Sequence, residues 1–485
     1  MKNKNKLYSY AKSILAIENS LGKSDFDDAL NELDGLITSV MRREGSDMQI
    51  IPTPDIDSLF KTMAQAIALS GNLEESPTKE RTCDVLFISS ELYKTGGHTR
   101  EIEDWCRSLA PECRVALLVS KPSTDADFGI RLHDGSNVTT YRCNSQTAME
   151  RVSWIRSVIL ELRPKSVMVS PSANDSALFV ALCLSHFDGK VFLNLNLDHN
   201  VSPGLGLEVI DHVVVRRIYL LQLLRREYGV KNAVYIPFSR SGQTNVKNHT
   251  PTFKNGPATF SCTSSSAKIA SSYGYPFCDV IPEMIIKCGL THVHVGAISE
   301  SSVRKIQAKL LEVDMSDRFI HITHAENLAT VFKEYGVNIL IQTFPIGGGL
   351  VAIEAMRSGL AIVNHKCYRT RQFFAADFTY PGAFSWSRPE ELFRLVSLMD
   401  EDQFARHHSD SLAYYETFNK MGKVERVLKD HVIENTPFDE EYFEELYRYP
   451  LDHFRIQSTA PLKQKDRIGF LDKLKKELRR LYERM

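Results

Sequence analysis

The sequence lacks any run of about 18 consecutive apolar residues, and no apolar segment of the signal-peptide type follows its basic N-terminus. We therefore expect a cytoplasmic protein without a membrane-crossing helix. The sequence also lacks an excess of charge of either sign, because 59 lysines and arginines stand against 60 aspartates and glutamates. Without an overall basic field, the composition does not indicate sequence-independent binding to nucleic acid.

Paired cysteine motifs are absent as well. The nine cysteines are scattered, their number is odd, and no two of them are separated by two residues. Several lie inside apolar runs, such as Cys183 in ALFVALCLSH. This pattern is typical of buried, reduced thiols in a cytoplasmic protein.

The sequence has no Asp-x-Asp motif after a predicted strand, which is where such a motif would hold a cation on a diphosphate. Asp25-Phe-Asp27 and Asp55-Ile-Asp57 lie in helical sequence, and Asp125-Ala-Asp127 lies in a polar loop. We therefore expect no essential metal ion. The motifs HExxH, GxSxG and the Walker lysine motif are also missing, which argues against hydrolase and kinase functions.

What the sequence does contain is an ordered series of helical and strand patterns. Residues 1–75 predict a helical N-terminal appendage, because apolar residues recur three and four positions apart. From residue 83 onward, short apolar runs without alternation are separated by helical segments, as in parallel sheets buried on both faces. The polar segment 239–257 divides two such blocks, 83–238 and 258–400. We predict an α/β fold with two doubly wound, Rossmann-like domains that face each other across a cleft.

The C-terminal part of the chain is predicted to be helical. Helices over 400–435 are expected to cross the hinge between the two domains, and 436–485 forms a tail. The end of the tail, 470–485, predicts a basic amphipathic helix. This pattern fits a helix packed on the fold or a solvated charged end, and it also fits a helix on a membrane surface, so peripheral membrane contact is one expectation.

One segment, FPIGGGLVAIEAMRSGLAIV (344–363), carries most of the functional argument. A predicted strand ends here, and Gly347, Gly348 and Gly349 precede a helix that carries Glu354. Free backbone N–H groups and the positive end of a helix dipole then lie at the sheet edge where α/β domains bind ligands. Because glycine has no Cβ, a phosphate can approach this backbone closely. A carboxylate one turn inside the helix suits the hydroxyl groups of a ribose, although a tight packing turn would also use glycine.

A second segment, ISSELYKTGGHTREIEDW (88–105), repeats this construction in the first block. Gly96 and Gly97 follow a predicted strand and precede a helix, and Thr99 is expected to cap that helix. His98 is either a ligand-facing side chain or a turn residue. Together the two segments predict two loops on opposite walls of one cleft.

These two segments resemble the paired signatures of glycosyltransferases of the GT-B fold. The likeness is to cytoplasmic bacterial enzymes that use nucleotide-sugars to build surface polysaccharides, such as lipopolysaccharide, or to glycosylate proteins. LNLDHNVSPGLGLEVIDHVVVRR (195–217) and DRFIHITHAENLATVFKEYGVNILIQTFPIGGG (317–349) resemble further segments of such proteins. The resemblance extends roughly over residues 83–435. It implies a nucleotide-sugar as co-substrate, no cofactor, and a glycan, lipid-linked or protein acceptor.

Carried over residue by residue, the resemblance implies a donor site mainly in the second block. Gly347, Gly348 and Gly349 would face the diphosphate, and Glu354 the ribose. Lys268 would neutralise the leaving diphosphate, although a surface lysine is the plainer alternative. The other implied donor residues are Ser264 and Ser265 beside phosphate, and His324 and Asn327 beside the base.

The acceptor would enter against the first block, near the loop of Gly96, Gly97, His98 and Thr99. His199 would act as general base on the acceptor hydroxyl, with Asp198 orienting it, unless the pair only caps a loop.

One position departs from the resemblance. Many retaining members carry a second Glu eight residues before the ribose-binding one, and this sequence has Ile346 there. Either the donor is held differently, as in inverting relatives, or the site has lost activity. Two rivals to a metal-independent glycosyltransferase therefore stay open: a non-catalytic accessory subunit of a glycosyltransferase complex, and a nucleotide-sugar epimerase.

Overall fold

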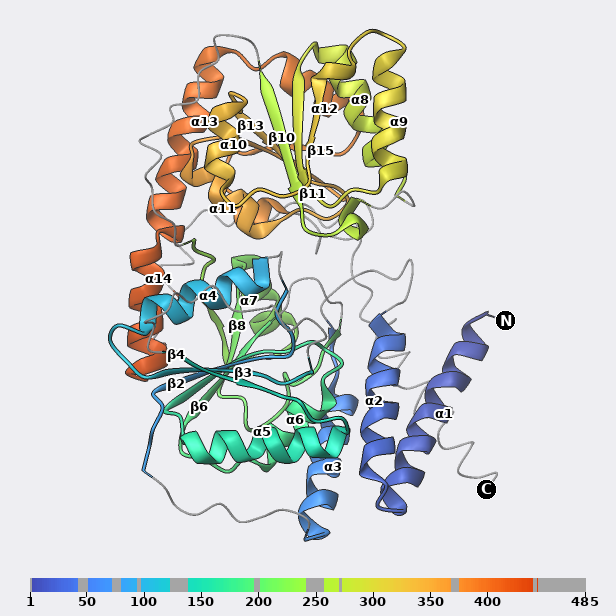
Figure 1. Cartoon of the computed structure of the whole chain (residues 1–485), viewed down its shortest axis with the longest axis vertical. Coiled ribbons are helices and arrows are strands. Elements are labelled where there is room, and N and C mark those ends of the chain that lie inside the picture. Colours follow the sequence, from blue (N-terminus) through green and yellow to red (C-terminus); the bar gives the residue numbers. More distant parts are fainter. Residues whose placement is uncertain are drawn as a thin grey trace.

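The computed structural model describes residues 2–41, 51–71, 80–93, 97–122, 138–195, 201–240, 257–269, 273–367, 375–438 and 443. Two parallel sheets form two units, one above the other in Figure 1, and helices cover both faces of each sheet. The predicted fold class, two doubly wound α/β domains, is confirmed. No helix in the described part of the chain combines the length and the apolar character needed to cross a bilayer.

The N-terminal unit is built on a parallel sheet with the strand order β4-β3-β2-β5-β6-β8-β9. The order reverses between β2 and β5, so the loops after these two strands separate and leave a switch point. The central strands are buried on both faces, because their Val, Leu and Ile side chains pack against helices on either side. The elements are β2 (Val85–Ser89), α4 (Gly97–Leu109), β3 (Val115–Val119), β4 (Val138–Arg142), α5 (Ala148–Leu162), β5 (Ser166–Ser170), α6 (Ser176–Leu184), β6 (Lys190–Asn194), β8 (His212–Val215), α7 (Ile218–Gln222) and β9 (Ala233–Tyr235).

The C-terminal unit repeats this plan with the order β12-β11-β10-β13-β14-β15, again all parallel. Its switch point lies between β10 and β13, and separate apolar cores fill the two sides of the sheet. The elements are β10 (Ala258–Thr263), α8 (Phe277–Cys288), β11 (Thr291–Gly296), α9 (Glu300–Leu311), β12 (Phe319–Ile322), α10 (Leu328–Glu334), β13 (Ile339–Ile341), α11 (Gly349–Arg357), β14 (Ala361–His365), β15 (Phe384–Trp386) and α12 (Pro389–Ser397).

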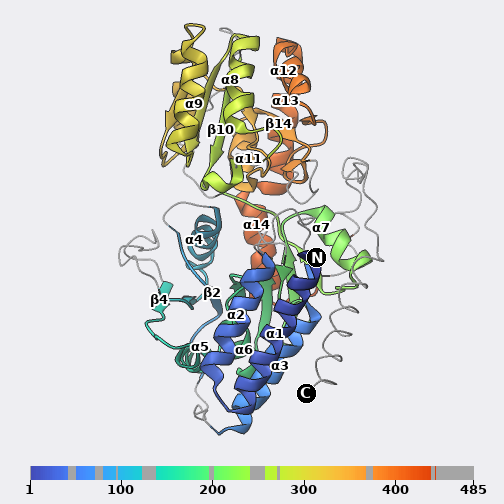
Figure 2. The same ribbon diagram turned by 90° about the vertical axis from the view of Figure 1, so that its right-hand side faces the viewer.

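The N-terminal appendage comprises α1 (Lys2–Gly22), α2 (Phe26–Met41) and α3 (Pro54–Leu69), and it packs along one side of the N-terminal unit (Figure 2). Its apolar side chains belong to the same core as the sheet. Phe60 is fully buried and stacks on Phe179 of α6, with ring centroids 4.9 Å apart. The appendage is thus part of the N-terminal unit rather than a separate arm.

Three carboxylates of the appendage also hold backbone N–H groups of the N-terminal unit. Asp27 accepts from Met149 at 2.8 Å, and Asp34 accepts from Ser176 at 2.9 Å, each in the first turn of a helix. Asp57 accepts from the N–H groups of Gly204 and Gly206 at 2.6 and 2.8 Å. Beside this contact, β1 (Ile51–Pro52) pairs in parallel with β7 (Val201–Ser202). The appendage therefore fixes loops and helix ends by polar contacts as well as by packing.

The chain returns to the N-terminal unit after the second sheet. The helix α13 (Glu401–Tyr414) packs against α11 and β14, and α14 (Met421–Val427) lies beside the lower unit in Figures 1 and 2. Val424 and Leu428 are fully buried in the core of the N-terminal unit. The Ser166 hydroxyl at the start of β5 donates a hydrogen bond to the Val432 carbonyl. These helices therefore tie the two units together.

Candidate functional site

A cavity of about 300 Å³ lies between the two units. Most of its wall comes from the C-terminal edge of the second sheet, where β10, β11 and β12 end, and from the start of α11. Gly97, Arg100 and Arg240 complete the wall from the N-terminal unit. Carboxyl ends of parallel strands beside a switch point are where α/β sheets bind ligands.

The glycine loop before α11 has a fixed shape. The Gln342 side chain accepts from the Gly348 N–H at 3.0 Å and donates to the Gly348 carbonyl at 3.1 Å. The Thr343 hydroxyl donates to the Ile346 carbonyl at 2.7 Å, and the Ile346 N–H donates to the Lys268 carbonyl at 3.3 Å. The sequence analysis did not identify Gln342. Its position, as a polar residue directly after the apolar strand β13, could have indicated that its side chain holds the following loop.

Gly348 and Gly349 line the cavity, and Gly347 belongs to the same loop. Both lining glycines are also needed for packing. A Cβ on Gly348 would lie 2.7 Å from Val351 Cγ1, and one on Gly349 would lie 2.8 Å from Phe238 Cε2. The glycines therefore serve close packing as well as an open approach to the backbone.

Glu354 lines the cavity from α11 and forms an ion pair that the sequence did not predict. Its Oε1 accepts from Arg240 Nε at 2.7 Å, and a second guanidinium nitrogen of Arg240 donates to Asp104 of α4 at 3.0 Å. Burial opposes the charge of Arg240, but Glu354 and Asp104 more than offset this, so the pKa of the guanidinium is raised. Arg240 thus connects the two units through two carboxylates.

Two further cations line the cavity. Lys268 comes from the 3-10 turn after β10 (Ser266–Ile269), and Arg100 comes from the first turn of α4. Ser264 also lies in the wall. The neighbouring Ser265 is exposed, and its N–H and carbonyl both bond the Thr263 hydroxyl. Against the two carboxylates in the same wall, Glu326 and Glu354, the three cationic side chains leave one net positive charge, which favours an anionic ligand.

The segment after β12 forms another part of the wall, and His324 lies in it. Asn327 is the N-cap of α10, where its Oδ1 accepts the Ala329 N–H at 2.9 Å. Its side chain is therefore engaged in capping the helix.

The start of α4 contacts the start of α11 in the other unit. A Cβ on Gly97 would lie 2.9 Å from Leu350 Cδ1, so the two units touch at this point. His98 Nε2 lies 2.9 Å from the Ser89 hydroxyl. The expectation that Thr99 caps α4 is wrong, because the helix already begins at Gly97. Thr99 is buried in the first turn, and its hydroxyl accepts the Tyr93 N–H at 2.7 Å.

Some predicted residues lie outside the described part of the chain. These are Gly96, Asp198 and His199, together with the basic segment 470–485. The role of Asp198 and His199 stays a prediction. Among the residues that the structure does describe, no three His, Cys, Asp or Glu side chains are grouped to hold a metal ion.

Comparison with known proteins adds a fold assignment. No family model matches the sequence, and no curated protein matches it significantly. Among solved structures, a glycosyltransferase from Rickettsia africae superposes with a TM-score of 0.56 at 12% identity, covering 73% of this chain and 100% of that one. The chain has the GT-B fold of glycosyltransferases.

Two other solved GT-B structures agree. Anabaena HepE, in complex with UDP and glucose, has a TM-score of 0.53 at 12% identity and covers 72% of this chain and 98% of its own. A mutant O-GlcNAc transferase from Thermobaculum terrenum has a TM-score of 0.53 at 13% identity, and the match covers 86% of this chain and 80% of that one. In GT-B terms, the cavity lies between the two Rossmann-like domains and faces the C-terminal sheet.

Proposed function

We propose that this GT-B protein is a glycosyltransferase that moves a sugar from a nucleotide-sugar to a glycan, lipid-linked or protein acceptor. The observation that carries the proposal is the cavity in which the glycine loop, Lys268 and Glu354 converge. The HepE structures with UDP and with UDP-glucose support a donor of this class on the same fold.

In this proposal the donor diphosphate binds at the start of α11. The Gly348 N–H already donates to Gln342, so the backbone N–H groups from Gly349 onward and the helix dipole favour negative charge there. Lys268 and Arg100 add charge from two sides of the cavity. As the bond to the sugar breaks, negative charge grows on the leaving diphosphate, and fixed cations stabilise that state more than the ground state.

The ribose is assigned to Glu354. One carboxylate oxygen accepts from Arg240, which leaves the other to accept from a ribose hydroxyl. Arg240 therefore orients the carboxylate, and Asp104 orients Arg240 in turn. The base is assigned to the wall near His324.

The acceptor side is assigned to the N-terminal unit, with the loop 96–99 beside the donor and His199 as general base, oriented by Asp198. The contact between Gly97 and Leu350 brings this loop against the donor loop. Contact of this kind excludes water, which favours transfer over hydrolysis. We further propose that the reaction needs no metal and belongs to bacterial cell-surface glycan synthesis on the inner face of the membrane.

Calorimetric titration with UDP, GDP, CMP and ADP tests the donor site. We expect one nucleotide to bind, and Glu354→Ala to weaken that binding by about 10- to 100-fold, because a hydrogen bond to a charged group is lost. The matched control is Glu300→Ala, a highly exposed carboxylate on α9 that should change nothing. A folded protein that binds none of the four nucleotides would overturn the proposal.

Ile346 favours one alternative, a non-catalytic subunit of a glycosyltransferase complex. Such a subunit would bind a nucleotide without turnover. Incubation of the protein with radiolabelled nucleotide-sugars and bacterial membranes separates the two, since an active enzyme transfers label to an acceptor. The anomeric configuration of that product then decides between retention and inversion.

A further inference from the structure

The cavity between the two units has two ends of different chemistry. Lys268 follows β10 and the start of α11 follows β13, so one end lies over the switch point of the C-terminal sheet. The other end is formed by the segment 323–328, which follows β12, two strands away from β10. Neighbouring strands lie about 4.8 Å apart, so β12 lies roughly 10 Å from β10. A ligand that fills the cavity therefore presents a different group at each end.

Glu326 belongs to the end formed by the segment 323–328, where its exposed side chain lines the cavity. No residue in the described part of the chain forms a hydrogen bond or an ion pair with its carboxylate. The other carboxylate of the wall, Glu354, is paired with Arg240 at 2.7 Å. Glu326 therefore keeps both carboxylate oxygens for a ligand.

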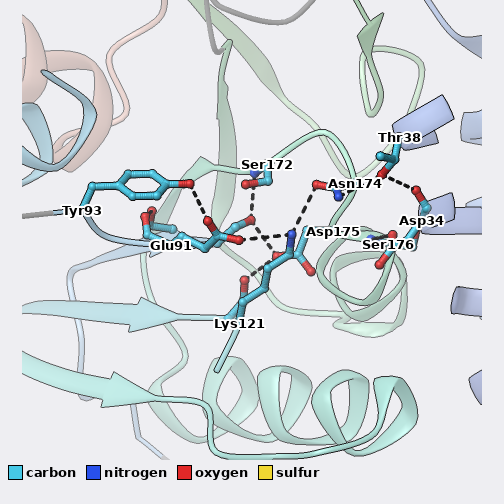
Figure 3. Close-up of polar contacts among 12 residues, drawn as sticks. Asp34, Thr38, Glu91, Tyr93, Lys121, Ser172, Asn174, Asp175 and Ser176 are labelled. Atoms are coloured by element: carbon cyan, nitrogen blue, oxygen red, sulfur yellow. Dashed lines mark hydrogen bonds and ion pairs between the residues drawn. The ribbon is translucent and has the colours of Figure 1, made fainter. Parts of the chain in front are cut away.

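Figure 3 shows the opposite case, at the edge of the N-terminal sheet. Asp175 is fully buried there, and its Oδ2 accepts from the hydroxyls of Ser90 and Ser120 at 2.6 and 2.5 Å. Glu91 accepts from the Tyr93 hydroxyl. The protein itself supplies the donors for these carboxylates, whereas the donors for Glu326 must come from water or from a ligand.

The charge of Glu326 restricts which part of a nucleotide-sugar can lie beside it. A carboxylate repels a phosphate, so the diphosphate belongs at the end with Lys268 and the start of α11. In the proposed binding mode, the group that reaches the segment 323–328 is the base. Glu326 therefore faces the hydrogen-bonding edge of the base.

The bases differ in the donors that this edge offers. Guanine presents two adjacent donors, N1–H and N2–H, beside the acceptor O6. Uracil presents one donor between two carbonyl groups, and adenine and cytosine place an acceptor nitrogen beside their amino group. An ionised carboxylate only accepts, so both of its oxygens match guanine, whereas one oxygen would face a lone pair on each of the other bases. His324 lines the same end, and a ring N–H can donate to O6.

We propose that the donor is a GDP-sugar and that Glu326 selects its guanine base; this rests on the proposed function. The two oxygens of Glu326 accept from guanine N1–H and N2–H, and His324 donates to O6. Glu326 is then a specificity-determining residue, and its partners in the complex belong to the ligand alone.

The test is calorimetric titration of the full chain with GDP, inosine diphosphate, UDP and ADP. Inosine diphosphate lacks the 2-amino group of guanine but keeps N1–H and O6. We expect wild type to bind GDP about tenfold more tightly than inosine diphosphate, and at least tenfold more tightly than UDP or ADP. Glu326→Ala should abolish the difference between GDP and inosine diphosphate.

Glu326→Gln is the sharper variant, because its amide NH2 faces one of the two guanine donors. GDP should lose about tenfold in affinity, while UDP and ADP should lose nothing. A side chain with a merely structural role would weaken all nucleotides alike. Glu300→Gln, the same change at a highly exposed carboxylate on α9, is the matched control.

The outcomes separate this proposal from the proposed function. If another nucleotide binds more tightly than GDP and Glu354→Ala weakens that binding, the guanine proposal is overturned and the transferase proposal stands. Equal binding of GDP and inosine diphosphate to wild type, or wild-type affinity for GDP in Glu326→Gln, also overturns it. If GDP binds best through Glu326 but no GDP-sugar gives up its sugar to an acceptor, the guanine site stands and the transferase proposal fails. A folded protein that binds none of these nucleotides overturns both.

Discussion

The two sheets of this GT-B protein share one topology but end in edges of different construction. At the edge of the C-terminal sheet, glycines, small polar residues and a lysine surround an open cavity. At the edge of the N-terminal sheet, Asp175 and its partners fill the space with hydrogen bonds, and the appendage braces it. The same sheet plan therefore leaves one edge open beside glycines and fills the other with side chains bonded to one another.

Buried titratable groups differ between the appendage contact and the two sheets in the direction of their pKa shifts. Burial raises the pKa of Asp34, at the contact between appendage and N-terminal unit, to about 6. In the C-terminal unit, burial lowers the pKa of His294 to about 3 and that of His365 to about 4. His212 of β8 behaves like these histidines, with a pKa lowered to about 4 by burial. The contrast therefore lies between a carboxyl group at the appendage contact, whose pKa is raised, and buried histidines of both sheets, whose pKa values are lowered.

The largest expected effect comes from the packing of the appendage. Phe60→Ala removes a fully buried ring that stacks on Phe179, and we expect a loss of about 3–5 kcal/mol in the free energy of unfolding. Urea unfolding followed by far-UV circular dichroism measures it. Phe260→Ala, at an equally buried ring in the other unit, is the matched variant. If Phe60→Ala costs less than 1 kcal/mol, the appendage is not part of the N-terminal core.

The next effect is acid destabilisation of the C-terminal unit. A histidine whose folded pKa is lowered contributes its full stability above the unfolded pKa of about 6.5, and this contribution is lost as the pH falls toward the folded pKa. For His365, with a pKa of about 4, the loss between pH 7 and pH 4 is about 3 kcal/mol. Thermal unfolding from pH 7 to 4 measures it, and His365→Gln should reduce the slope. If the stability of His365→Gln falls with pH as steeply as that of wild type, His365 is not a cause of the acid destabilisation.

Asp34 should destabilise the protein as the pH rises, which is opposite to the effect of His365. Its folded pKa is raised to about 6, so the protonated form adds stability that is fully present below about pH 4 and is lost as the pH rises through 6. Asp34→Asn keeps an acceptor for the Ser176 N–H but cannot ionise. We expect its free energy of unfolding, relative to that of wild type, to rise by about 2 kcal/mol between pH 4 and pH 8. Asp28→Asn, on the same helix, is a comparison variant. A pH profile unchanged in Asp34→Asn would show that this carboxylate ionises as it does in water.

The smallest effect concerns the link between the units. Arg240→Gln breaks the contacts to Glu354 and Asp104, and we expect nucleotide binding to weaken about tenfold. Asp104→Asn, which leaves the Glu354 contact in place, should weaken it less. Calorimetry with the nucleotide that wild type prefers measures both. Unchanged affinity in Arg240→Gln would mean that Glu354 needs no partner from the N-terminal unit.

Sequence patterns were sufficient for the fold class and for the place of the glycine loop. Buried central strands such as β2 and β3 are almost entirely apolar, and a glycine-rich turn before a helix can be recognised from neighbouring residues alone. The edge strands β4 and β15 were missed, because half-exposed strands carry polar residues like Thr139 and Ser385.

The contacts of Glu354 could not be predicted. Arg240 stands in a polar stretch that looked like a linker, and its pairing with Glu354 and Asp104 depends on how the two units meet. The role of the appendage was missed for the same reason, since Asp27, Asp34 and Asp57 bind backbone groups far along the chain. Thr99 was misjudged because the helix starts at Gly97, three residues earlier than a cap at Thr99 requires.

The packing of Phe60 on Phe179 has a consequence for how the chain is made. A ribosome synthesises the appendage before α6, and the α6 surface that covers it is encoded roughly 120 residues later. At 5–20 residues per second, the apolar face of α3 waits on the order of 10 s before its partner emerges. During that interval the apolar face of α3 stays exposed on the nascent chain, where chaperones can bind it.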